Sequence, residues 1–145
     1  MINPTLKTLS LALMLATGFS SPIFAGGNQV RIQQWGMGNG AGGSQAGNRN
    51  RLTVYQYGWS NSSISVQDGN RNRVVVGQTG FANSTATTQN GNCNIAGVAQ
   101  FGGSHSATTS QNGNCNAVAV IQGGNGNSAA AHQYGNGNVS VIIQD

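Results

Sequence analysis

Residues 67–78 read Gln-Asp-Gly-Asn-Arg-Asn-Arg-Val-Val-Val-Gly-Gln, and this stretch decides the fold because its pattern recurs along most of the chain. A glutamine returns every eleven residues. A glycine follows each of the first ten glutamines by two positions, and an asparagine follows by five, except at His105. The glutamines stand at positions 34, 45, 56, 67, 78, 89, 100, 111, 122, 133 and 144. Alternate units read Gln-x-Gly-Asn-x-Asn, so a period of twenty-two residues overlies the shorter one, as is typical of solenoids.

Each eleven-residue unit has the composition of one strand and one turn. Residues 51–56, 73–78 and 139–144 are rich in β-branched or aromatic side chains, which favour strands. The Gly-Asn-x-Asn segments hold residues that tolerate a positive φ, as turns require. The turn glycines are expected at Gly47, Gly58, Gly69, Gly80, Gly91, Gly102, Gly113, Gly124 and Gly135. A supercoiled helix can also have an eleven-residue period, but a glycine and an asparagine in every unit would break it.

Two strands and two turns close one flattened coil. The sequence therefore predicts an all-β, two-sheet β-solenoid (cross-β) of about five coils, each of twenty-two residues. Side chains two positions apart share a face of a strand, which places Leu52 and Val54 inside and Arg51 outside. The inward face also holds the asparagines and glutamines. Because each amide has a donor and an acceptor, stacked copies are expected to form hydrogen-bonded ladders.

The chain divides into three expected segments. Residues 1–25 are predicted to be a signal peptide, since residues 9–19 are apolar but too short to span a bilayer and Ala25 is a small residue before the expected cut. The mature protein would begin near Gly26 and be exported. Residues 26–44 are glycine-rich and form either a weak first coil or a separate segment, and residues 45–145 form the repeat core.

The composition excludes most enzymes. Charged residues are 6% of the chain, against roughly 25% in an average soluble domain. Asp68 and Asp145 are the only acidic residues, so a paired-carboxylate site within one chain would have to recruit the last residue. The sequence therefore indicates no catalysis, no cofactor and no metal site.

The end of the repeat predicts self-assembly. Solenoids usually carry polar caps, and none is recognised here. Residues 139–144 read as a strong strand with one residue after it. Because an unpaired strand edge is a template for another chain, copies are expected to stack end to end into fibrils.

An exported chain of Gln-x-Gly-x-x-Asn-x5-Gln units resembles curlin, the subunit of bacterial curli fibres, over residues 34–144. The resemblance implies a functional amyloid on the cell surface that serves biofilm matrix, adhesion and aggregation. It also implies export through the periplasm and a dedicated outer-membrane secretion pore with accessory chaperones, and a nucleator subunit as partner. The family's ladder residues correspond here to Gln45, Asn50, Gln56, Asn61, Gln67, Asn72, Gln78, Asn83, Gln89, Asn94, Gln100, Gln111, Asn116, Gln122, Asn127, Gln133, Asn138 and Gln144.

The chain departs from the curlin pattern in two places. Curlins usually carry a glycine-rich segment before the repeats that addresses them to the pore, whereas residues 28–34 here are already in register. Residues 26–44 are therefore expected to be the address segment, a weak first coil, or both. Curlins also commonly lack cysteine, and this chain has two.

Cys93 and Cys115 are twenty-two residues apart and are expected to stack in adjacent coils. Their Cα atoms would lie near 5 Å apart, within the range of a disulfide, and the export route is oxidising. Stacked side chains point in parallel, however, which strains such a bond. A disulfide, two free thiols and metal binding are therefore the three alternatives.

Arg49, Arg51, Arg71 and Arg73 form two expected columns of like charge. With the aromatic residues near them, these columns are a candidate contact for extracellular DNA or polysaccharide. The alternative is that they are gatekeepers, which slow premature association and keep the monomer soluble.

Two other functions compete with the bulk fibre subunit. The first is the minor nucleator subunit of the same fibre, although the regular final repeat favours the bulk subunit. The second is a monomeric β-solenoid that binds ice or carbohydrate, which needs one flat face with a regular column, for instance of threonine. The threonines at positions 53, 85, 87, 108 and 109 make no such column.

Overall fold

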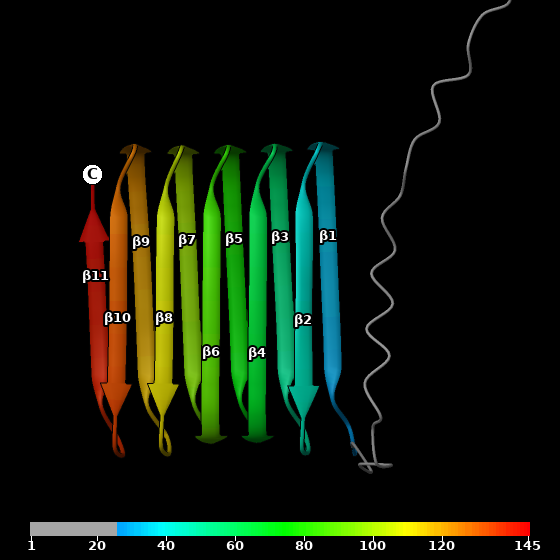
Figure 1. The fold of residues 1–145 in the computed structure, drawn as a ribbon, viewed down its shortest axis with the longest axis vertical. Coiled ribbons are helices and arrows are strands. Elements are labelled where there is room, and N and C mark those ends of the chain that lie inside the picture. The colour runs from blue at the N-terminus through cyan, green and yellow to red at the C-terminus, as the bar shows by residue number, and fades with distance from the viewer. Residues whose placement is uncertain (1–25) are drawn as a thin grey trace, which may run out of the picture.

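The computed structural model describes residues 26–145, and the expected signal peptide at residues 1–25 lies outside them. The described chain forms eleven strands that climb as a flattened spiral (Figure 1). The strands are β1 (Gln29–Met37), β2 (Gly40–Ala46), β3 (Arg51–Trp59), β4 (Ser62–Asn70), β5 (Arg73–Phe81), β6 (Ser84–Asn92), β7 (Ile95–Gly103), β8 (Ser106–Asn112), β9 (Ala117–Asn125), β10 (Ser128–Tyr134) and β11 (Val139–Gln144). Within residues 26–145, no helix is long and apolar enough to cross a membrane.

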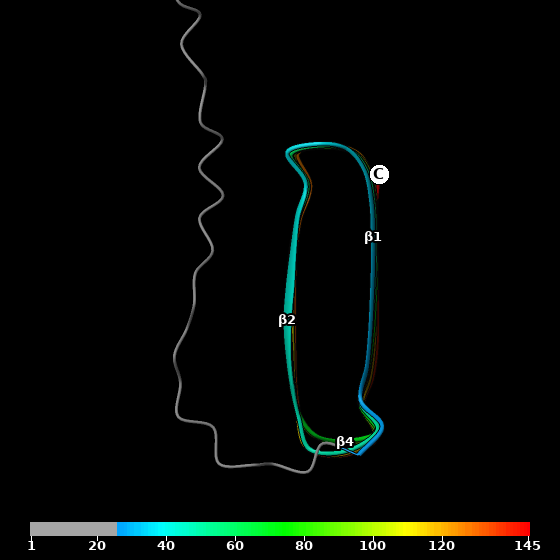
Figure 2. The same ribbon diagram turned by 90° about the vertical axis from the view of Figure 1, so that its right-hand side faces the viewer.

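The strands alternate between two parallel sheets. The odd-numbered strands form one sheet in the order β1-β3-β5-β7-β9-β11, which we call sheet A, and the even-numbered strands form the other, sheet B. Viewed along the stack, successive coils superpose in a narrow, elongated outline (Figure 2). Each strand pairs with the strand twenty-two residues away, so that Gln56 lies beside Gln78 and Arg51 beside Arg73. The predicted two-sheet β-solenoid of about five coils is confirmed.

The core is a thin layer between the sheets. Along β3, Leu52, Val54 and Gln56 are buried, while Arg51 and Tyr55 are exposed. This alternation recurs in β5, β7 and β9, and it confirms the predicted inward and outward faces. The buried apolar residues are Leu52, Val54, Val74, Val76, Ala96, Val98, Ala107, Val118, Val120, Ala129 and Ala131. Because most of them are small, the two sheets lie close enough for amide side chains to cross between them.

The turn glycines are required by how closely the coils stack. Gly58 and Gly80 have φ of 121° and 122°, values that residues with a Cβ rarely adopt. A Cβ on Gly58 would overlap the carbonyl oxygen of Gly80, and a Cβ on Gly80 would overlap that of Gly102. Glycine at these positions therefore lets the backbone of one coil pass directly over the next.

Residues 29–46 form the first coil of the solenoid in this structure. β1 and β2 pair in register with β3 and β4, although β2 is rich in glycine. Val30 and Ile32 on β1 are 54% and 39% exposed, since no coil covers them on one side among the described residues. Whether this coil also addresses the chain for export stays a prediction.

Candidate functional site: amide ladders and strand edges

Two glutamine ladders run the length of the solenoid, one inside each sheet. In sheet A, each Nε2 donates to the Oε1 of the glutamine twenty-two residues later, from Gln34 through Gln56, Gln78, Gln100 and Gln122 to Gln144, at 2.6–2.9 Å. In sheet B, the same bonds join Gln45, Gln67, Gln89, Gln111 and Gln133 at 2.6–2.9 Å. The ladders therefore have a direction, with every donor pointing toward the C-terminal end.

From Gln45 onward, the second hydrogen of each ladder glutamine ties the two sheets together. Gln56 Nε2 donates to the carbonyl oxygen of Gly40 at 2.9 Å, and Gln78 Nε2 donates to that of Ser62 at 2.9 Å. The interior glutamines thus use both donor hydrogens and their acceptor while they are almost fully buried. Burying an amide without partners costs several kcal/mol, so these bonds are what permit glutamine in the core.

The inward asparagines bond differently from the expected side-chain ladder. Asn50 Oδ1 accepts from the backbone N–H of Asn72 at 2.9 Å, and its Nδ2 donates to the carbonyl oxygens of Ala46 and Gly69 at 2.8 Å each. Side chain to side chain bonds occur at some coils, such as Asn83 Nδ2 to Asn61 Oδ1 at 3.0 Å. The asparagine column therefore mainly holds the turn backbone, because the turn brings N–H and C=O groups within reach of a short side chain.

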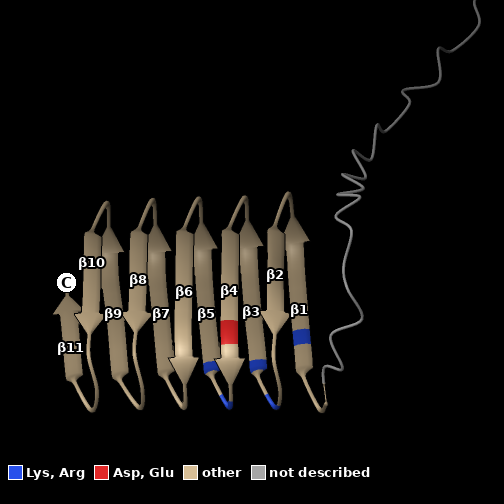
Figure 3. Cartoon of the chain, turned by 60° about the horizontal axis from the view of Figure 1, so that its bottom comes forward, with Lys and Arg blue, Asp and Glu red and all other residues tan. Residues whose placement is uncertain are grey.

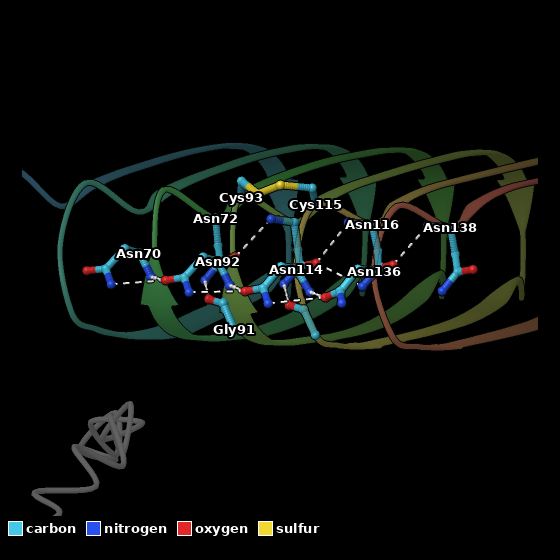
Figure 4. The surroundings of a disulfide bond; sticks show 12 residues. Asn70, Asn72, Gly91, Asn92, Cys93, Asn114, Cys115, Asn116, Asn136 and Asn138 are labelled. Carbon is cyan, nitrogen blue, oxygen red and sulfur yellow. Dashed lines mark hydrogen bonds between the residues drawn. A yellow bond between two sulfur atoms is a disulfide. The ribbon is translucent and has the colours of Figure 1, made fainter.

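Sequence reasoning missed a third amide ladder, which lies in the turns at one end of the strands. The backbone N–H and Nδ2 of Asn70 both donate to Oδ1 of Asn92, at 3.0 Å each, and Asn92 bonds to Asn114 in the same way (Figure 4). The ladder continues to Asn48 and Asn136. Its signal was the first asparagine of Gly-Asn-x-Asn, which recurs every twenty-two residues.

His105 occupies a core position that the repeat otherwise gives to asparagine, and it makes equivalent hydrogen bonds. Its backbone N–H donates to Asn83 Oδ1 at 3.1 Å, and its Nδ1 accepts from the backbone N–H of Asn127 at 3.2 Å. Because Nδ1 accepts, Nε2 carries the proton and donates to the carbonyl oxygen of Phe101 at 3.2 Å. Imidazole therefore reproduces both functions of the amide at this one position.

A disulfide joins Cys93 to Cys115, with a Cα–Cα distance of 4.6 Å (Figure 4). It links the β6–β7 turn to the β8–β9 turn. Both cysteines have positive φ, at 52° and 55°, and Arg49 and Arg71 have the same conformation at equivalent positions of earlier turns. The two cysteines approach only when their coils stack in register, so the bond ties one coil to the next.

The arginines gather on the N-terminal coils. Arg31, Arg51 and Arg73 lie on β1, β3 and β5, while Arg49 and Arg71 lie in the turns that precede β3 and β5 (Figure 3). The guanidinium of Arg31 lies 5.8 Å from the ring centroid of Tyr55, a cation–π contact. Asp68 lies on β4 of the other sheet (Figure 3). One end of sheet A is therefore basic.

Comparison with known proteins identifies the repeat in the first part of the described chain. The family model of the curlin-associated repeat matches residues 27–58 and 47–80. A search of curated proteins finds no match. The register of the matched residues continues through β11, where Gln144 pairs with Gln122. The match spans residues 27–80, and together with the fold it supports membership of the curlin family, whose repeats are structural.

Proposed function

We propose that this chain is the bulk structural subunit of a secreted, curli-like amyloid fibre, in which copies add to one another through their terminal strands. The direction of the glutamine ladders carries the proposal. Since all the donors point the same way, the two ends of the solenoid differ in chemistry and complement each other.

The N-terminal end of the described solenoid offers acceptors. Gln34 and Gln45 donate to the next coil, but no described residue donates to their Oε1 atoms. The C-terminal end offers donors. Gln133 and Gln144 accept through Oε1, and each Nε2 donates only to a backbone carbonyl, of Ala117 and Ser128. A second copy stacked head to tail would join these donors to these acceptors.

The strand edges carry the same complementarity in the backbone. Among the described strands, β1 and β2 each pair on one side, and so do β10 and β11. Parallel strands of one copy can therefore continue both sheets of another, at the strand spacing of about 4.8 Å that cross-β fibres show. Each hydrogen bond contributes a net stabilisation of only about 0.5–1.5 kcal/mol, but one added coil forms many of them at once.

The cellular role follows from the family rather than from the geometry. Curli-type fibres are extracellular, and the signal peptide expected at residues 1–25 agrees with export. We propose that the fibre serves biofilm matrix, surface adhesion and aggregation, and that the chain leaves through an outer-membrane pore with accessory chaperones. Residues 26–44 are the candidate address segment, and a nucleator subunit is the candidate starting partner.

The basic end of sheet A supports a gatekeeper role. Arg51 lies beside Arg73 in the register, so every copy holds like charges side by side. This repulsion would slow association of unfolded chains and keep them soluble. The same charges would attract extracellular DNA or an anionic polysaccharide, which we propose as a secondary partner of the fibre.

A monomeric ice- or carbohydrate-binding solenoid is disfavoured by where the threonines lie. Thr85, Thr87 and Thr109 are buried, and Thr109 Oγ1 donates to Thr87 Oγ1 inside the core at 3.1 Å. They are not available to a flat ligand-binding face.

The proposal is tested by following fibrillation of residues 26–145 with an amyloid dye and then recording fibre diffraction. We expect seeded growth and a reflection near 4.8 Å along the fibre axis. A chain that stays monomeric at high concentration, without that reflection, would overturn the proposed function.

A further inference from the structure

The outer face of sheet A changes from basic to apolar about halfway along the stack of coils. On β7, β9 and β11, three outward-facing positions in a row, each two residues apart along the strand, hold apolar side chains or glycine. We call this surface the apolar face; it consists of Ile95, Gly97, Ala99, Ala117, Ala119, Ile121, Val139, Val141 and Ile143. Five of these are large and 40–76% exposed. The apolar face is thus a flat surface open to solvent.

The repeat itself does not require apolar residues there. The corresponding outward positions of sheet B carry Ser106, Thr108 and Ser110 on β8, and Ser128, Ala130 and His132 on β10. On β1, β3 and β5, the same face of sheet A carries Arg31, Arg51 and Arg73. The fold therefore tolerates polar residues at these positions, and the apolar face needs a separate explanation.

The size of the apolar face shows what can cover it. Three strands about 4.8 Å apart and five residues long at about 3.3 Å each give a footprint of roughly 240 Å². Two such faces in contact would bury about 500 Å², well below the roughly 1,200 Å² of a stable complex. Two monomers are thus not expected to pair through it. In a fibre the apolar face recurs with every copy, so that weak contacts act together.

The spacing of the side chains indicates the partner. Rows that repeat at the strand spacing interdigitate along their whole length only with a surface of the same repeat, as in the dry interface between paired cross-β sheets. We propose that the apolar face is the lateral contact through which two filaments of this chain pair. This inference rests on the proposed function, because it requires filaments.

The arginines restrict how the two filaments align. A shift that placed Arg31, Arg51 or Arg73 against the apolar face would remove a guanidinium from water without an acidic partner. Filaments therefore pair with apolar face against apolar face, and the basic halves stay hydrated. The partner is a second copy of this chain at the same level of its own filament.

The test adds two positive charges to the apolar face and, as a matched control, to sheet B. The face variant is Ile121→Lys with Val141→Lys, and the control is Ser110→Lys with Ala130→Lys, the corresponding positions of the preceding half-coils. We expect all three purified chains to elongate seeds at similar rates. The mass per unit length from electron microscopy should be twofold lower for the face variant than for the wild-type chain and the control.

Because the Lys variant could fail to fold, a second variant without charge, Ile121→Ser with Val141→Ser, is made as well. It should also shift the filaments from paired to single. Paired filaments in both face variants, or single filaments in the wild-type chain, would overturn the inference and leave the proposed function intact. A wild-type chain that forms no filaments would instead overturn the proposed function, and the inference with it.

Discussion

Gln111 Nε2 donates to Gln133 Oε1 at 2.8 Å, although the two residues are twenty-two positions apart in the chain. Gln111 also accepts from Gln89 and donates to the carbonyl oxygen of Ile95. One buried side chain therefore connects three coils of sheet B and reaches across to sheet A. This arrangement makes the glutamine column the most direct test of the solenoid.

Gln111→Ala should destabilise the folded chain by about 1–3 kcal/mol. The substitution leaves the Gln89 amide hydrogen and the Gln133 oxygen buried without their partners. The measurement is the midpoint of guanidinium denaturation. Asn112→Ala is the control, because the side chain of Asn112 is exposed and should change the midpoint little. Equal effects of the two substitutions would show that the ladder adds nothing to stability.

Gln133→Ala with Asn138→Ala should slow fibril elongation several-fold while leaving the other coils folded. These amides lie at the C-terminal end, where Gln133 Nε2 is available to an incoming copy. The rate is measured by seeded growth under an amyloid dye. Ser128→Ala, on the same strand but facing outward, should elongate at the wild-type rate. Unchanged kinetics of the double variant would contradict end templating.

Gly80→Ala should cost more than about 2 kcal/mol and interrupt the stacking of coils. The new Cβ would overlap the carbonyl oxygen of Gly102, and the φ of 122° strains any residue with a side chain. Gly77→Ala is the control, since a Cβ there meets nothing within 4 Å and no positive φ is required. Chemical denaturation of both variants compares them directly. A similar loss at Gly77 would refute the steric explanation.

Cys93→Ser with Cys115→Ser should lower stability by about 3 kcal/mol, the loop-closure estimate for a bridge across about twenty residues. The unfolded wild-type chain should show no free thiol until a reductant is added, which a thiol titration measures. Reduction of the wild-type chain should reproduce the lower denaturation midpoint of the double variant. Two free thiols titrated in the unfolded wild-type chain before any reductant is added would remove the disulfide from the description.

Ser65→Ala should leave stability unchanged or raise it by up to about 1 kcal/mol. The Ser65 hydroxyl is buried and has no hydrogen-bond partner, so folding removes it from water without compensation. Ser62→Ala is the matched control on the same strand, since Ser62 faces outward. Both are compared by denaturation midpoint. A marked loss of stability at Ser65 would show that its hydroxyl is bonded in solution.

Much of the fold was predictable because the repeat is nearly strict. Two residues separated by twenty-two positions occupy the same place in successive coils, so the pairing of Arg51 with Arg73 followed from counting. The inward burial of Leu52 and Val54 followed from strand alternation. The turn ladder of Asn70 and Asn92 did not follow, because strand alternation stops at the turn and gives no direction for the side chains beyond it.

The repeat alone determines the period, the number of residues in each coil, the stacking register and the face on which each strand residue lies. The reason is that a strict repeat fixes which residues stack, and the two-residue alternation of a strand fixes which of them point inward. Only the folded chain shows which acceptor each side-chain amide donates to. Gln56 reaches the next glutamine and the carbonyl of Gly40, whereas Asn50 is shorter and holds the turn backbone. The physical reason is that these partners are set by the curvature of the turns and the distance between the sheets, which depend on all the coils packing together.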